Sequence, residues 1–178
     1  MINPWKLVKE NIIYQNKFGY TLRDDDVITP AGKPGKFMVL ESRGFAVVIA
    51  ITKENKIIMV RQWRYTMGRE CLELPAGGIN KDEDNLIAAK RELEEETGAI
   101  SDDWQEIKSY WLGNGAMRVK GHIFLAKNAK LTGTIHTDDT EKIIIETYTY
   151  SELMDMINKN IITDDRSLLS LLLLPKYL

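Results

Sequence analysis

Short apolar runs bounded by turn residues make up most of the chain. The predicted strands share β-branched and aromatic side chains and lie at residues 5–14, 37–41, 45–51, 56–63, 70–74, 107–112, 121–127 and 143–150. The segment 29–35 is rich in Pro and Gly and predicts a turn. Four polar residues at 52–55 predict a hairpin between two of the strands.

The period changes to that of a helix between residues 83 and 97. Leu86, Ala89 and Leu93 recur on one side at 100° per residue, and Thr97 continues this seam. Gly98 is the expected residue just beyond the helix C-terminus. The seam predicts a helix that packs on a sheet.

Two further helices are expected at the end of the chain. Ser151 is the expected N-cap of the first, which runs to about residue 158. Thr163 is the expected N-cap of the second, a leucine-rich helix that stops before Pro175. Strands before and after a central helix in the sequence favour an α/β or α+β sandwich with a mixed sheet.

Composition narrows the class of protein. The chain has 178 residues, of which 44% are hydrophobic and 28% charged, which suits one globular domain with a small extension. A net charge of -2 gives no electrostatic basis for binding nucleic acid or an anionic membrane. Cys71 is the only cysteine, and the apolar run 168–174 is far shorter than the ~20 residues that span a bilayer. We therefore expect a cytoplasmic protein.

The predicted helix carries an acidic cluster. Glu92, Glu95 and Glu96 lie on one face, about 90° from the apolar seam. Two unit charges ~5 Å apart repel by roughly 3 kcal/mol at an effective dielectric of ~20, so such a cluster is spread into solvent, is protonated or binds cations. Oxygen ligands suit Mg²⁺ or Mn²⁺, and Arg91 is placed to neutralise a carboxylate.

These residues resemble the Nudix box, which reads Gly, five residues, Glu, seven residues, then Arg-Glu-U-x-Glu-Glu-x-Gly-U, where U is bulky and apolar. The matching positions are Gly77, Glu83, Arg91, Glu92, Leu93, Glu95, Glu96 and Gly98, whereas Ala99 replaces the last bulky residue. The resemblance implies the Nudix α/β/α sandwich for residues 45–178. It also implies a hydrolase that cuts a nucleoside diphosphate linked to another group.

The resemblance also implies residue roles. Glu92, Glu95 and Glu96 become ligands of Mg²⁺ or Mn²⁺, and Ala76 contributes its carbonyl. Glu83 and Arg91 become catalytic supports that hold the loop and the ligands.

Residues 60–64, 71–78 and 160–167 resemble the ADP-ribose and nucleotide-sugar pyrophosphatase branch of the family. This resemblance implies an antiparallel extension at residues 1–44 that forms a homodimer. Arg64, Arg61 and Glu73 become candidate substrate-binding residues. In this branch the general base comes from an acidic loop after the box, which makes Glu141 the first candidate and Asp139 the second.

The substrate stays open within this branch. The loop at 111–118 holds Gly113 and Gly115 and lacks the proline that ADP-ribose enzymes of the branch carry there. ADP-ribose and other nucleoside diphosphate sugars therefore both remain candidates. Two alternatives are a Nudix hydrolase of nucleoside triphosphates or capped RNA, and a non-catalytic module that senses a nucleotide.

Overall fold

The structure is a computed structural model that describes residues 4–133 and 142–177. Its strands are β1 (Lys6–Lys9), β2 (Ile12–Gln15), β3 (Thr21–Ile28), β4 (Pro34–Glu41), β5 (Phe45–Thr52), β6 (Ile57–Arg64), β7 (Arg69–Glu73), β8 (Ala76–Gly78), β9 (Ala99–Ile100), β10 (Asp103–Leu112), β11 (Met117–Leu131) and β12 (Ile143–Tyr148). Its helices are α1 (Asn85–Thr97), α2 (Tyr150–Asn158), α3 (Asp165–Leu173) and the 3₁₀ turn η1 (Leu174–Lys176). This is the mixed-sheet α/β architecture expected from the sequence.

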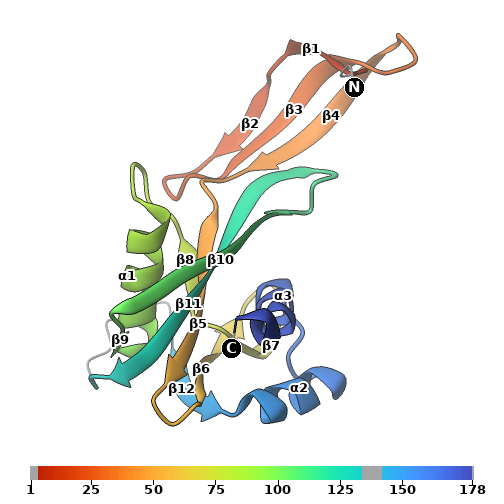
Figure 1. The fold of residues 1–178 in the computed structure, drawn as a ribbon. Helices are drawn as coiled ribbons and strands as arrows, with labels where there is room; N and C mark the ends of the chain where they lie inside the picture. Colours follow the sequence, from red (N-terminus) through yellow and green to blue (C-terminus); the bar gives the residue numbers. More distant parts are fainter. Residues whose placement is uncertain (1–3, 134–141, 178) are drawn as a thin grey trace.

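The first four strands form an antiparallel sheet that projects from the rest of the chain (Figure 1). Its link to the main sheets is a short parallel pairing of β4 with the start of β11. Strand β3 was not predicted, because its Arg-Asp-Asp-Asp run lacks an apolar pattern. In the structure Arg23 forms an ion pair of 2.9 Å with Asp25, and Lys36 of β4 compensates Asp24 at 3.6 Å and Asp26 at 2.6 Å.

The main body holds two sheet segments that diverge from one hairpin. Strands β10, β11, β5 and β8 form one segment, and β6 pairs with β7 and β12 in the other. The only registered pair between β5 and β6 is Ile51 with Ile57. Beyond that pair the two strands separate, and the chain crosses from one segment to the other between β7 and β8.

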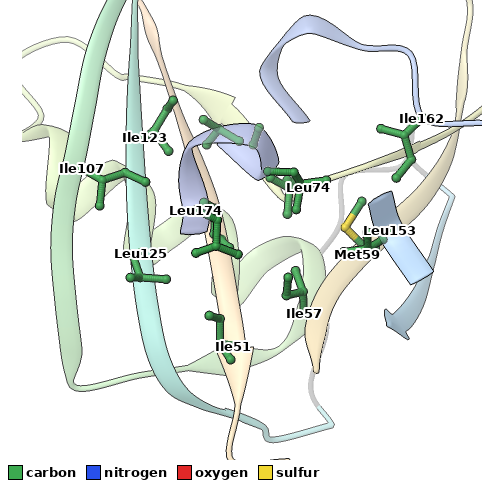
Figure 2. Close-up of a cluster of buried hydrophobic side chains, with 14 of the residues drawn as sticks. Ile51, Ile57, Met59, Leu74, Ile107, Ile123, Leu125, Leu153, Ile162 and Leu174 are labelled. Carbon is green, nitrogen blue, oxygen red and sulfur yellow. The ribbon is translucent and has the colours of Figure 1, made fainter. Parts of the chain in front are cut away.

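Two hydrophobic clusters cover the two faces of the sheet in the main body. One packs under α1 and contains Ala89, Leu93 and Ile58. The other lies toward α2 and α3, and Figure 2 shows its Met59, Leu74 and Leu174 among the labelled side chains. The apolar seam predicted for α1 is confirmed, since Ala89, Leu93 and Thr97 are all buried.

The helix ends confirm one expectation and correct two. Gly98 ends α1 in the left-handed region with φ 62°, as predicted. The N-cap of α2 is Thr149 and not Ser151, because Thr149 forms a reciprocal capping box with Glu152. The N-cap of α3 is Asp164 and not Thr163, because the Asp164 carboxylate accepts a hydrogen bond from the Ser167 amide.

Within residues 4–133 and 142–177, no helix combines the length and the apolar character needed to cross a membrane.

Candidate active site

Strand β8 and helix α1 bring the acidic cluster against a glycine. Asp84 caps the helix by accepting hydrogen bonds from the amides of Leu86 and Ile87. Strand β8 runs beside β5, with Gly77 opposite Ala46. A Cβ built on Gly77 would lie 2.0 Å from the carboxyl carbon of Glu92. The close approach of backbone to carboxylate therefore requires glycine at this position.

Arg91 links most of the charged residues in the site. Its guanidinium donates to Glu83 at 2.8 and 3.0 Å, to Glu92 at 2.6 Å, to Glu95 at 2.9 Å and to the Gly78 carbonyl at 2.9 Å. These bonds, led by the one to Glu83, raise the pKa of Arg91, and the same contact lowers the pKa of the Glu83 carboxyl. Arg91 thus offsets the repulsion expected between neighbouring carboxylates.

Glu96 is buried and faces the backbone of β8. Its Oε2 accepts a hydrogen bond of 3.0 Å from the Ala76 amide. The bonds from Val48 to the Pro75 carbonyl and from Ile79 to the Gly44 carbonyl make the intervening Ala76 a non-hydrogen-bonded position of the ladder. Both backbone groups of Ala76 therefore point away from β5, which puts its carbonyl on the edge that Glu96 contacts.

The donors suit a hard divalent cation, although the described side chains do not converge on one point. Among residues 4–133 and 142–177, no three acidic, His or Cys side chains are close enough to hold a metal ion as they stand. Arg91 lies between the carboxylates instead. The available donors, three carboxylates and one carbonyl, are all oxygens, and the missing Cβ of Gly77 leaves room for Glu92. The chemistry of the donor set therefore fits Mg²⁺ or Mn²⁺.

A second charged cluster joins Arg64, the last residue of β6, to Glu73, the last residue of β7. Arg64 donates to both carboxylate oxygens of Glu73, from Nε at 2.9 and 3.1 Å. Arg166 of α3 donates to the same carboxylate at 3.2 Å. Glu73 is only 2% exposed, so the two guanidinium groups neutralise a buried charge. Arg166 was not predicted, because a single basic residue in the first turn of a helix carries no signal of a distant partner.

The structure separates Arg61 from this cluster. Arg61 lies three residues before Arg64 on β6 and therefore points to the opposite face. There it forms a bidentate ion pair with Glu146 of β12, at 2.8 and 2.9 Å. The pKa of the Glu146 carboxyl is lowered by this contact. The structure thus places Arg61 and Arg64 on opposite faces of β6, and the substrate-binding role of each stays a prediction.

Both candidates for the general base, Glu141 and Asp139, lie outside the described residues. The described chain resumes at Lys142, and Ile143 then pairs with Gln62 of β6. Gln62 is two residues before Arg64, so the chain returns beside the end of β6 that carries Arg64. Gln62 is itself buried, and its Nε2 has no hydrogen-bond partner among residues 4–133 and 142–177.

Most of the chain matches a known protein family. A model of the NUDIX domain matches residues 42–171. The chain is 32% identical to the "Methanol dehydrogenase activator" of Bacillus methanolicus over 93% of this chain and 89% of that protein. It is 31% identical to the "ADP-ribose pyrophosphatase" of Bacillus subtilis (strain 168), over 80% of this chain and 78% of that protein.

The fold has a close structural counterpart. A crystal structure described as an "ADP compounds hydrolase" superposes with a TM-score of 0.85 and covers 99% of this chain and 95% of that chain. The sequence identity in this pair is 17%, so the similarity concerns the fold alone.

Proposed function

Because the chain belongs to the Nudix family of hydrolases, we propose that it hydrolyses a nucleoside diphosphate sugar to a nucleoside monophosphate and a sugar phosphate. ADP-ribose is the first candidate substrate, in keeping with the name of the Bacillus subtilis relative. The observation that carries the proposal is the arrangement of the box. Glu92 and Glu96 lie against the backbone of β8 and Glu95 bonds Arg91, while Arg64, the last residue of β6, bonds Glu73, the last residue of β7.

The box residues are proposed to hold a divalent cation, Mg²⁺ or Mn²⁺. Glu92, Glu95 and Glu96 would be its ligands together with the Ala76 carbonyl. A bound divalent ion supplies charge neutralisation on the diphosphate and lowers the pKa of its water. Arg91 keeps two of the ligands in place, because its Nη1 donates to both Glu92 and Glu95. Glu83 in turn orients Arg91 by accepting a hydrogen bond from its Nε.

Arg64 is the proposed ligand of the diphosphate, and Glu73 orients it. A guanidinium fixed by a carboxylate presents its remaining donors in one plane, which suits phosphate oxygens. Glu141 is the proposed general base, with Asp139 as the alternative, and either would remove a proton from the attacking water.

The protein is further proposed to be a cytoplasmic homodimer. The projecting N-terminal sheet exposes large apolar side chains, among them Val8, Ile13, Tyr14 and Met38. A small sheet of four strands with exposed apolar groups needs a cover, and a second copy of the same sheet supplies one. Light scattering should give the mass of a dimer at micromolar concentration, and a monomer would count against this assignment.

The test is a panel of nucleoside diphosphate sugars assayed with and without magnesium. Release of both products only with the metal supports the proposal, and the preferred substrate identifies the base and sugar. Glu96→Gln is the matched variant, because the amide keeps an acceptor for the Ala76 amide and removes only the charge. We expect its turnover to fall at least 100-fold. Hydrolysis confined to nucleoside triphosphates or capped RNA would favour the alternative enzyme, and tight nucleotide binding without turnover would favour a sensor.

A second candidate function is activation of a dehydrogenase. It rests on the 32% identity with the "Methanol dehydrogenase activator", which extends over 93% of this chain. The test adds this protein to the methanol dehydrogenase of Bacillus methanolicus and measures the rate of methanol oxidation. A rate that rises with the wild type and not with Glu96→Gln would connect activation to hydrolysis.

A further inference from the structure

We propose that Arg166 of α3 is a positioning residue that sets the orientation of Arg64 through Glu73. The inference rests on the proposed function, since it takes Arg64 as a ligand of the diphosphate. It assigns a role in substrate binding to a helix that contributes none of the box residues.

Glu73 is hydrogen-bonded by two arginines. This carboxylate is almost completely buried and bonds two guanidinium groups, that of Arg64 from β6 and that of Arg166 from α3. Without Arg166, Oε2 would lose the contact from α3 and would keep only its bonds to Arg64. A buried carboxylate that loses one of two cations reorients toward the other or toward water. The side chain that Glu73 fixes, Arg64, would then move with it.

Arg166 is itself held in place by the packing of the first turn of α3. Asp164 caps α3 by accepting a bond of 3.0 Å from the Ser167 amide, and the Ser167 hydroxyl accepts one of 2.7 Å from the buried Leu74 amide. The first turn of α3 is thereby attached to the residue that follows Glu73. The guanidinium carbon of Arg166 also lies 5.6 Å from the centre of the Phe45 ring, within the range of a cation–π contact.

Arg166 lies between the two sheet segments. Phe45 pairs with Gly78 of β8, which places it in the segment that carries the box. Glu73 pairs with Val60 of β6, which places it in the segment that carries Arg64. Arg166 contacts both Phe45 and Glu73, so it connects the two segments where strands β5 and β6 have separated. The position of Arg64 relative to the box therefore depends on Arg166.

The test is a double-mutant cycle of Arg166→Gln and Arg64→Gln. The readouts are kcat and KM for the preferred diphosphate, and the affinity for the non-hydrolysable α,β-methylene analogue of ADP-ribose measured by calorimetry. Arg166→Gln should raise KM and weaken analogue binding about tenfold in the wild-type background. It should change both by less than about twofold in the Arg64→Gln background, because the residue that it positions is already absent.

Two controls separate positioning from folding. Arg69→Gln removes another hydrogen bond between β7 and the segment before α3, the 2.7 Å bond to Thr163, without touching Glu73. It should leave KM within about twofold of the wild type. Arg166→Lys keeps a cation beside Glu73 and should recover part of the lost affinity. Thermal unfolding of every variant identifies any that is unfolded at the assay temperature.

The possible results lead to different conclusions. Equal losses from Arg166→Gln in both backgrounds, or no loss in either, would overturn the role of Arg166 and leave the proposed function standing. The same conclusion follows if Arg166→Gln is unfolded and the folded Arg166→Lys has wild-type affinity. A wild-type protein that neither binds the analogue nor hydrolyses any diphosphate sugar would overturn the proposed function, and this inference with it.

Discussion

Replacing Gly77 by alanine tests whether the contact between β8 and Glu92 determines activity. The added Cβ would lie 2.0 Å from the carboxyl carbon of Glu92 and 2.1 and 2.2 Å from its oxygens, whereas real Cβ contacts stay beyond 3.0 Å. The carboxylate must therefore retreat by about 1 Å. Displacements of ~1 Å in a catalytic group cost on the order of 100-fold in rate, so kcat should fall about 100-fold.

The fold should tolerate the same change. The obstructing atoms are the end of a flexible side chain, and φ at Gly77 is not positive. Alanine also restricts the unfolded chain, which contributes about 0.4–1 kcal/mol of stability. We therefore expect the free energy of unfolding to change by less than about 1 kcal/mol and Tm by less than about 4 °C.

The measurements are kcat over a magnesium titration and Tm by thermal unfolding. Gly78→Ala is the matched control, because a Cβ on Gly78 meets nothing within 4 Å. It should lose no more than about threefold in kcat. Wild-type turnover in a folded Gly77→Ala would refute the argument that Gly77 sets the position of Glu92.

Three further predictions concern stability. Gly98→Ala puts a side chain on a residue with φ 62° and should cost about 1 kcal/mol, seen as a Tm lower by about 2–4 °C, while Gly98→Asn should cost less. Thr149→Ala removes the capping box of α2 and should also cost about 1 kcal/mol in urea unfolding, whereas Thr149→Ser should cost little. Glu83→Gln should lower Tm at pH 7, because Arg91 lowers the pKa of the folded carboxyl below its ordinary value of 4.5. A carboxyl with a lowered pKa stabilises the fold at a pH above its ordinary pKa, and this contribution is lost as the pH falls through the lowered pKa. The Tm values of the variant and the wild type should therefore converge in acid. A difference in Tm that grows toward acid would contradict that sign.

Local patterns predicted the central helix well. Gly98 ends α1 because a left-handed residue is needed there, and the spacing of Ala89 and Leu93 defines its buried face. The N-caps of α2 and α3 were each misplaced by a residue or two. In both segments several neighbouring residues have suitable oxygens, and only the backbone conformation selects one. Strand β3 was missed because Asp24 and Asp26 are compensated by Lys36 of β4, a contact that the local pattern of β3 does not reveal.

The sequence by itself determined the chemistry of the box, because Gly77, Glu83, Arg91 and the three glutamates lie within one strand–loop–helix unit whose geometry follows from local spacing. Only the tertiary structure decided the partners of the arginines on β6. Alternation along a strand sends Arg61 and Arg64 to opposite faces, but which carboxylate meets each depends on how β12 and α3 return to the sheet. The contact between Arg166 and Glu73 joins residues 93 positions apart. Such contacts are set by the packing of whole elements, and no local pattern of apolar and polar residues records them.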